Sequence, residues 1–105
     1  MTDARIVLST AGSAQEAGAI ARALVETTLA ACVNIVPKIE SVYRWQGKIE
    51  QATEWLLIIK TQAAQVEHVF NAIQGLHSYE LPECVAVEVS AGSEPYLSWI
   101  TENTA

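Results

Sequence analysis

Residues 39 to 59 read IESVYRWQGKIEQATEWLLII and carry the most informative pattern of the sequence. In the first part of this stretch, residues of two faces alternate, as in a β-strand. One of these faces carries Ile39, Ser41, Tyr43 and Trp45. Gln46-Gly47 then suits a two-residue turn, and a return strand begins at Lys48. Because residues 55–59 are continuously apolar, the return strand is expected to be buried on both faces there. The stretch therefore predicts a long β-hairpin that projects beyond a small domain.

Before the hairpin, the sequence predicts a strand, a helix and a further strand. A short buried strand is expected over Ile6–Leu8. Ser13 begins a helix that ends near Thr28, and the S-x-x-E spacing to Glu16 is that of a capping box. The apolar stripe of this helix consists of Ala17, Ile20, Ala21, Leu24 and Val25. Strand-like residues 32–36 follow.

Pro37 interrupts the strand-like residues 32–36, and a proline cannot donate a hydrogen bond to a sheet ladder. We therefore expect a bulge or a sheet edge at this point. After the hairpin, residues 63–74 predict a second amphipathic helix, with Gly75 as its C-terminal stop. The stripe of this helix consists of Val66, Val69, Phe70 and Ile73.

The C-terminal part is expected to add a strand over residues 84–90 and a short helix opened by residues 92–95, with Pro95 in its first turn. The whole chain then reads β-α-β-β-α-β plus a final helix, which is the ferredoxin-like order of an α+β fold. This order predicts one domain over residues 1–105, with an antiparallel sheet and two helices on one face. The other face needs a cover, and the candidates are Trp45, Trp55 and Trp99.

Composition excludes several classes of function. Half of the 105 residues are apolar, which is a large share for a chain this short and favours burial at a subunit interface. The formal net charge of -6 opposes binding to nucleic acid and to anionic membranes, but is compatible with metal cations. We expect no signal peptide, and the sequence has no apolar run near the roughly 20 residues of a membrane helix. The two cysteines form no cluster, so we expect reduced thiols in a cytoplasmic protein.

The candidate chemistry is concentrated in the loop 76–83. His77 lies there with Glu80 and Glu83, and a histidine with nearby carboxylates can bind a divalent metal or exchange protons. Alternatively, the two carboxylates cap or pair within the loop while His77 hydrogen-bonds to the backbone. His68 is expected on the surface. No phosphate-binding loop, nucleophile elbow or zinc-protease motif is present in the sequence, so we do not expect an enzyme.

Other residues allow both a structural and a binding interpretation. Cys32 and Cys84 lie among small apolar residues, where a free cysteine is usually part of the core. The cations near strand ends are Arg44, Lys48 and Lys60, which can hold an anion or form surface salt bridges. The tryptophans suit core or interface packing, or stacking on a ligand.

Four strings in order resemble the CutA family of divalent-cation tolerance proteins. They are LAACVNI at 29–35, SVYRWQGK at 41–48, LHSYELPE at 76–83 and YLSW at 96–99. The resemblance extends from about Ile6 to Ile100. It implies a ferredoxin-like fold and a tight homotrimer whose hairpins reach neighbouring subunits, like the trimers of PII nitrogen-signalling proteins. It also implies a link to tolerance of copper and other divalent cations.

Site residues follow from this resemblance together with the residues above. The metal ligands would be His77, Glu80 and Glu83. An effector cleft between subunits would use Cys32, Arg44, Trp45, Lys60 and Tyr79. The trimer interface would use Tyr43, Trp45, Trp55 and Trp99. Two residues depart from the family pattern: Ser9 stands at the end of the first strand in place of a copper-binding cysteine, and Ser78 replaces the proline of a His-Pro-Tyr loop. A hydroxyl is a poor copper ligand.

Four functional hypotheses remain open from the sequence. The first is a trimeric protein of the metal response that binds copper or another divalent cation. The second is a PII-like sensor that binds a small effector between subunits. The third is an enzyme that uses His77 with Glu80 or Glu83 as acid and base. The fourth is a structural trimer that acts through a protein partner.

Overall fold

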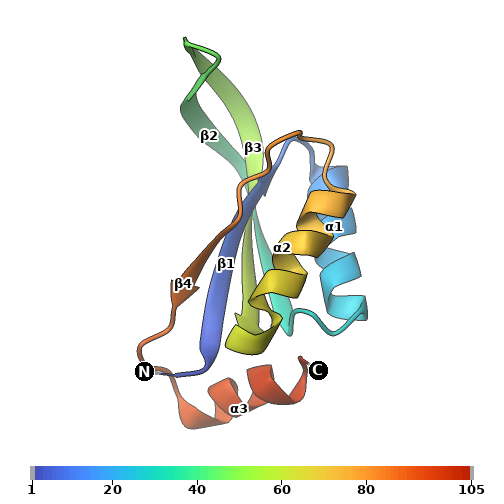
Figure 1. The fold of residues 1–105 in the computed structure, drawn as a ribbon, viewed down its shortest axis with the longest axis vertical. Coiled ribbons are helices and arrows are strands. Elements are labelled where there is room, and N and C mark those ends of the chain that lie inside the picture. Colours follow the sequence, from blue (N-terminus) through green and yellow to red (C-terminus); the bar gives the residue numbers. More distant parts are fainter. Residues whose placement is uncertain (1, 105) are drawn as a thin grey trace.

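The computed structural model describes residues 2–104, which form a four-stranded antiparallel sheet with three α-helices. The strands lie in the order β2-β3-β1-β4, so the predicted ferredoxin-like fold is confirmed. The elements are β1 (Ala4–Ala11), α1 (Ala14–Glu26), β2 (Cys32–Trp45), β3 (Lys48–Gln62), the 3-10 turn η1 (Ala63–Gln65), α2 (Val66–Leu76), β4 (Val85–Glu88) and α3 (Glu94–Glu102). Helices α1 and α2 cover one face of the sheet, and α3 lies across one end (Figure 1).

The predicted hairpin is confirmed, and it extends well past the rest of the sheet (Figure 1). Trp45 pairs with Lys48 across a two-residue loop. Both loop residues have positive φ, 51° at Gln46 and 81° at Gly47, as a type I′ turn requires. Because this turn matches the right-handed twist of its strands, the two longest strands stay paired to their tip, and the molecule is 44 Å long.

The irregularity predicted at Pro37 is a β-bulge. The register of β2 against β3 shifts between Val36 and Ile39, and Lys38 adopts φ 56°. Pro37 lacks the N–H that a ladder would need here. After the bulge, Ile39 pairs with Glu54, which sets the face on which the rest of the hairpin presents its side chains. This is the face away from α1 and α2.

The core lies between the sheet and the two covering helices. Its fully buried members include Val7, Ile20, Leu24, Leu57, Ile59, Val69 and Ile73. Trp55 pairs with Ala11 and alternates with Leu57, so it points to this core and packs against it. The expectation that all three tryptophans cover the opposite face is therefore wrong for Trp55. That opposite face, here called the open face, carries Trp45 instead.

Helix α1 begins as predicted, since the Ser13 side chain accepts a hydrogen bond from the Glu16 N–H at 3.1 Å. Its stripe is narrower than expected, because Val25 is 43% exposed. The predicted stop at Gly75 is wrong, since α2 continues through it to Leu76. The helix ends because His77 is extended, while the His77 N–H still reaches the Ile73 carbonyl at 2.9 Å.

The remaining boundaries differ modestly from the predicted ones. The first strand is longer than Ile6–Leu8, the last is shorter than residues 84–90, and the second helix starts with the 3-10 turn. Pro95 lies in the first turn of α3, as predicted. Gln62 Nε2 donates to Thr104 Oγ1 at 2.8 Å and ties the chain after α3 to the end of β3. No helix among residues 2–104 has the length and apolar character needed to cross a membrane.

Candidate functional site

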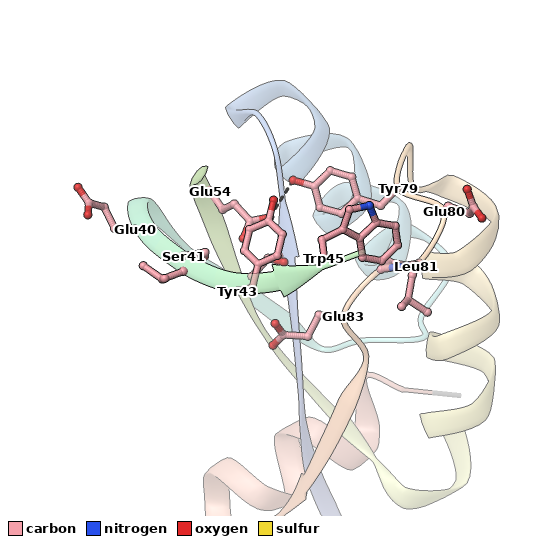
Figure 2. Close-up of a pocket in the computed structure, with 12 residues that line it drawn as sticks. Glu40, Ser41, Tyr43, Trp45, Glu54, Tyr79, Glu80, Leu81 and Glu83 are labelled. Atoms are coloured by element: carbon pink, nitrogen blue, oxygen red, sulfur yellow. Dashed lines mark hydrogen bonds between the residues drawn. The ribbon is translucent and has the colours of Figure 1, made fainter. Parts of the chain in front are cut away.

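A cavity of about 810 Å³ lies between the open face of the hairpin and the loop that follows α2. Figure 2 shows side chains from both segments turned toward this space. The lining residues are Thr10, Glu40, Ser41, Val42, Tyr43, Trp45, Glu54, Tyr79, Glu80, Leu81, Pro82 and Glu83. Ser41, Tyr43 and Trp45 are here because of the two-residue period after the bulge, as predicted for one strand face.

His77 anchors the loop to β1. Its Nε2 lies 2.6 Å from the Thr10 carbonyl oxygen, and its Nδ1 accepts a hydrogen bond from the Tyr79 N–H at 3.1 Å. These two partners require the neutral tautomer with the proton on Nε2. The His77 side chain is 0% exposed. Both ring nitrogens therefore bind backbone groups, which was the alternative interpretation of this histidine.

Glu16 is a second anchor of the same loop. Its carboxylate accepts hydrogen bonds from the Ser78 N–H at 2.8 Å and the Ser78 hydroxyl at 3.1 Å. The capping-box expectation that Glu16 reaches back to its own helix is thus corrected, because Ser78 takes its oxygens. Burial acts to raise the pKa of Glu16, but the hydrogen bonds from the Ser78 hydroxyl and N–H outweigh it, and the pKa is lowered. A proline at position 78 would offer neither donor.

Tyr79 is the third anchor and the first that lies in the cavity. Its hydroxyl donates to Glu54 Oε2 at 2.7 Å, a bond drawn in Figure 2. Burial and then the bond to Glu54 raise the pKa of Tyr79 above its ordinary value. The Tyr79 ring also lies against His77, with 4.5 Å between ring centroids. The hydroxyl passes so close to Gly12 that a Cβ atom there would lie 2.9 Å from it.

The cavity is acidic. It is lined by Glu40, Glu54, Glu80 and Glu83, and among the described residues no lysine, arginine or histidine lines it. Glu54 is only 7% exposed, whereas the other three are exposed. Within residues 2–104, the ion pair of Arg5 with Glu88 lies elsewhere, and the Glu16 carboxylate lies 3.9 Å from Nδ1 of the neutral His77 ring. A buried carboxylate without a cationic partner is costly, so the site is suited to cationic ligands.

The residues predicted to bind a metal are not brought together in one chain. Glu80 and Glu83 line the cavity, but His77 does not, and its nitrogens are occupied. Over the described part of the chain, no group of three or more His, Cys, Asp and Glu side chains is placed to hold a metal ion. Ser9 is not at the strand end as expected, because β1 continues to Ala11. Ser9 is fully buried on the helix side of the sheet.

The residues predicted for an effector cleft separate into two groups within the chain. Trp45 and Tyr79 line the cavity. Arg44 lies between the lining residues Tyr43 and Trp45 in the sequence but does not itself line the cavity. Cys32 and Lys60 are cross-strand partners at the opposite end of the β2–β3 ladder. The Lys60 ammonium group hydrogen-bonds to the Asn34 side chain there. Both cysteines are free thiols and half-buried, and burial raises the pKa of Cys84.

Of the residues predicted for a trimer interface, three present large exposed surfaces. Tyr43, Trp45 and Trp99 are 44%, 42% and 40% exposed, while Trp55 packs on the core. His68 is exposed, as predicted. Sequence reasoning missed Glu40, Glu54 and Thr10 as lining residues. The only signal for Glu54 is its two-residue spacing from Leu56, which places both on the open face once the bulge fixes the register.

Comparison with known proteins gives one consistent result. Residues 5–103 match the family model described as CutA1 divalent ion tolerance protein. The chain is 46% identical over 99 residues to the divalent-cation tolerance protein CutA of Thermus thermophilus, covering 94% of this chain and 96% of that protein. It is 47% identical over 85 residues to human protein CutA, covering 81% of this chain. The crystal structure of CutA from Xylella fastidiosa superposes with a TM-score of 0.97 at 43% identity and covers 99% of this chain and 100% of that one.

Relatives differ in length and in the compartment that their names give. The chain spans 48% of the human protein and 50% of the Arabidopsis thaliana relative, which is named protein CutA, chloroplastic. None of the three relatives described here bears the name of an enzyme.

Proposed function

Because this chain belongs to the CutA1 divalent ion tolerance family, we propose that it acts in the response to divalent metal ions as a cation-binding protein and not as an enzyme. The observation that carries the proposal is the cavity of about 810 Å³ lined by four glutamates. Carboxylate oxygens attract cations, and the low exposure of Glu54 strengthens its field because water screens it less.

In this proposal the metal ligands are carboxylates of the cavity, and His77, which the sequence predicted as a ligand, is not among them. Glu80 and Glu83 remain candidate ligands, and Glu54 lines another part of the same cavity. Oxygen ligands favour hard divalent cations over copper, which prefers imidazole and thiolate. Copper binding at His77 requires the ring to give up the Thr10 carbonyl or the Tyr79 N–H. We therefore expect copper to bind at His77 only weakly.

Assembly into a homotrimer belongs to the same proposal. The hairpin carries exposed apolar side chains, with Val42 62% and Ile49 67% exposed, and Val85 and Val87 of β4 are about half exposed. Strand β2 is also the outer strand of its sheet, so its free edge can pair with another chain. We propose that subunits meet along these surfaces and that Tyr43 and Trp45 lie where a neighbour borders the cavity. A cytoplasmic location remains part of the proposal.

A PII-like sensor is the second candidate function, and the size of the cavity favours it. Pockets for small organic ligands are typically about 300–1,000 Å³, and a single metal ion needs far less space. In this case an effector would lie between the hairpin and the 79–83 loop, against Trp45 and Tyr79.

Calorimetric titration of the intact protein with Mn(II), Zn(II), Ni(II) and Cu(II) tests the proposal. We expect saturable binding that Glu83→Gln weakens and that His77→Ala leaves in place, provided that circular dichroism shows this variant folded. Glu67→Gln on the exposed side of α2 is the matched control. Loss of binding in His77→Ala alone, with Glu83→Gln unaffected, would place the metal at the histidine and overturn the cavity assignment.

A further inference from the structure

The carboxylate of Glu54 can accept further hydrogen bonds in the cavity. Its Oε2 accepts the bond from Tyr79, and among residues 2–104 no other hydrogen bond or salt bridge reaches the carboxylate. The residue is 7% exposed and lines the cavity. A carboxylate in this position gains from a ligand that brings both a positive charge and an N–H donor.

Aromatic rings surround the same space. Tyr43, Trp45 and Tyr79 all line the cavity, as Figure 2 shows. The faces of such rings attract ammonium groups, and tryptophan does so most strongly. They also supply apolar surface for the methylene groups of a ligand. Bare metal ions use neither property, so the rings favour an organic cation.

The spread of the carboxylates indicates more than one positive charge. Glu54 comes from β3 and is buried, whereas Glu80 and Glu83 belong to the loop and are exposed. No three of these groups lie close enough to hold one metal ion in the part of the chain described. A flexible chain with separated ammonium groups can satisfy the buried carboxylate and one at the rim at once.

We infer that the cavity binds a small aliphatic di- or polyamine, with one ammonium group on Glu54, the methylene chain along Trp45 and Tyr43, and a second ammonium group at Glu80 or Glu83. This inference rests on the proposed cation-binding role of the same cavity. It narrows the ligand of the sensor hypothesis from any effector to a multivalent organic cation. It also gives the net charge of -6 a specific use beyond solubility.

Calorimetry of the intact protein in EDTA, with spermidine as the probe, tests the inference. We expect saturable binding, and we expect propylamine, which has one ammonium group, to bind at least about tenfold more weakly. Glu54→Gln should lower spermidine affinity by about tenfold or more, because a hydrogen bond to a charged group is lost. Glu67→Gln is again the control. Should Glu54→Gln fail to fold, Trp45→Ala at the exposed end of the hairpin should weaken binding instead.

Each result decides between the two proposals. Equal spermidine binding by Glu54→Gln and Glu67→Gln would show attraction to the acidic surface only and would overturn the inference. Divalent metal binding at the cavity without spermidine binding would overturn the polyamine and leave the proposed metal function standing. If neither spermidine nor a divalent metal ion binds at the cavity, the polyamine inference and the proposed metal function are both overturned.

Discussion

The hydroxyl of Tyr79 donates to Oε2 of Glu54 at 2.7 Å and joins two residues that lie 25 positions apart in the chain. Tyr79 belongs to the loop after α2, and Glu54 belongs to β3. The bond closes one side of the cavity and positions the buried carboxylate that faces it (Figure 2). The shape of the candidate site therefore depends on how the 77–79 segment is held.

Removing this hydroxyl should destabilise the fold. Tyr79→Phe leaves the buried Glu54 carboxylate without a donor, and we expect a loss of about 1–3 kcal/mol in the free energy of unfolding. Urea denaturation measures it. Tyr96→Phe, whose exposed ring stacks on Trp99, is the control and should change little. Equal effects of the two substitutions would show that the bond contributes nothing.

Gly12 leaves room for the hydroxyl of Tyr79. A Cβ at position 12 would lie 2.9 Å from the Tyr79 hydroxyl oxygen, so Gly12→Ala must displace the ring end and weaken its bond to Glu54. Gly18→Ala meets nothing within 4 Å and lies within α1, so it should stabilise by about 0.5–1 kcal/mol.

A double-mutant cycle shows whether Gly12→Ala and Tyr79→Phe destabilise the protein through the same hydrogen bond. If Gly12→Ala acts through Tyr79, its cost in unfolding free energy should shrink in a Tyr79→Phe background, where the displaced oxygen is absent. Additive costs would contradict this coupling.

Several features were predictable because they depend on local sequence. The hairpin follows from a two-residue period on both sides of Gln46-Gly47, and the bulge from Pro37. The stop at Gly75 was wrong because the end of α2 is set by the tertiary contacts of His77, which no local pattern records. Trp55 was misplaced because a continuously apolar run does not show which residues face the helices.

Glu16 makes the anchor of the loop sensitive to acid. Its pKa is lowered from the ordinary value of 4.5, so its stabilisation is fully present above that value and is lost as the pH falls through the lowered pKa. Glu16→Gln should therefore reduce stability at pH 7, and the difference from the unmodified protein should vanish toward pH 2. Denaturant titrations from pH 7 to about pH 2 measure the difference in unfolding free energy between the two proteins.

Glu67→Gln controls for the acid test, because Glu67 also lies in the first turn of its helix, α2, and is exposed. It should show a smaller difference at neutral pH. A Glu16→Gln difference that does not depend on pH would contradict the ionic origin of the anchor.

The hydroxyl of Ser9 is an unsatisfied polar group in the core. Its hydroxyl is buried and has no hydrogen-bond partner within residues 2–104. Ser9→Ala removes that oxygen, so we expect an unchanged or higher free energy of unfolding, by up to about 1 kcal/mol. Thermal unfolding measures it, with Thr61→Val as a contrast, since the Thr61 hydroxyl does have a partner, the Leu29 carbonyl at 2.7 Å. A clear loss of stability in Ser9→Ala would show that the hydroxyl is satisfied.

The site itself could be predicted only in part. Tyr43, Trp45, Tyr79, Glu80 and Glu83 are in strings that the sequence brings to notice, and all five line the cavity. Glu54 lacks any such signal, because its role depends on the β2–β3 register, which the bulge between Val36 and Ile39 sets, and on the hydrogen bond from the distant Tyr79. Two roles of His77 were open from the sequence, a metal ligand or a group hydrogen-bonded to the backbone, and only the fold shows that its ring nitrogens contact the Thr10 carbonyl and the Tyr79 N–H.

The most direct test of the central claim is to locate the bound cation by two-dimensional ¹H–¹⁵N NMR. The protein is titrated first with Zn(II) and then, in EDTA, with spermidine. We expect the largest amide shifts in residues 41–45 and 79–83 and around Glu54, on both sides of the cavity. Shifts concentrated instead at His68, or at the far end of the ladder near Cys32 and Lys60, would contradict the assignment of the cavity as the cation site.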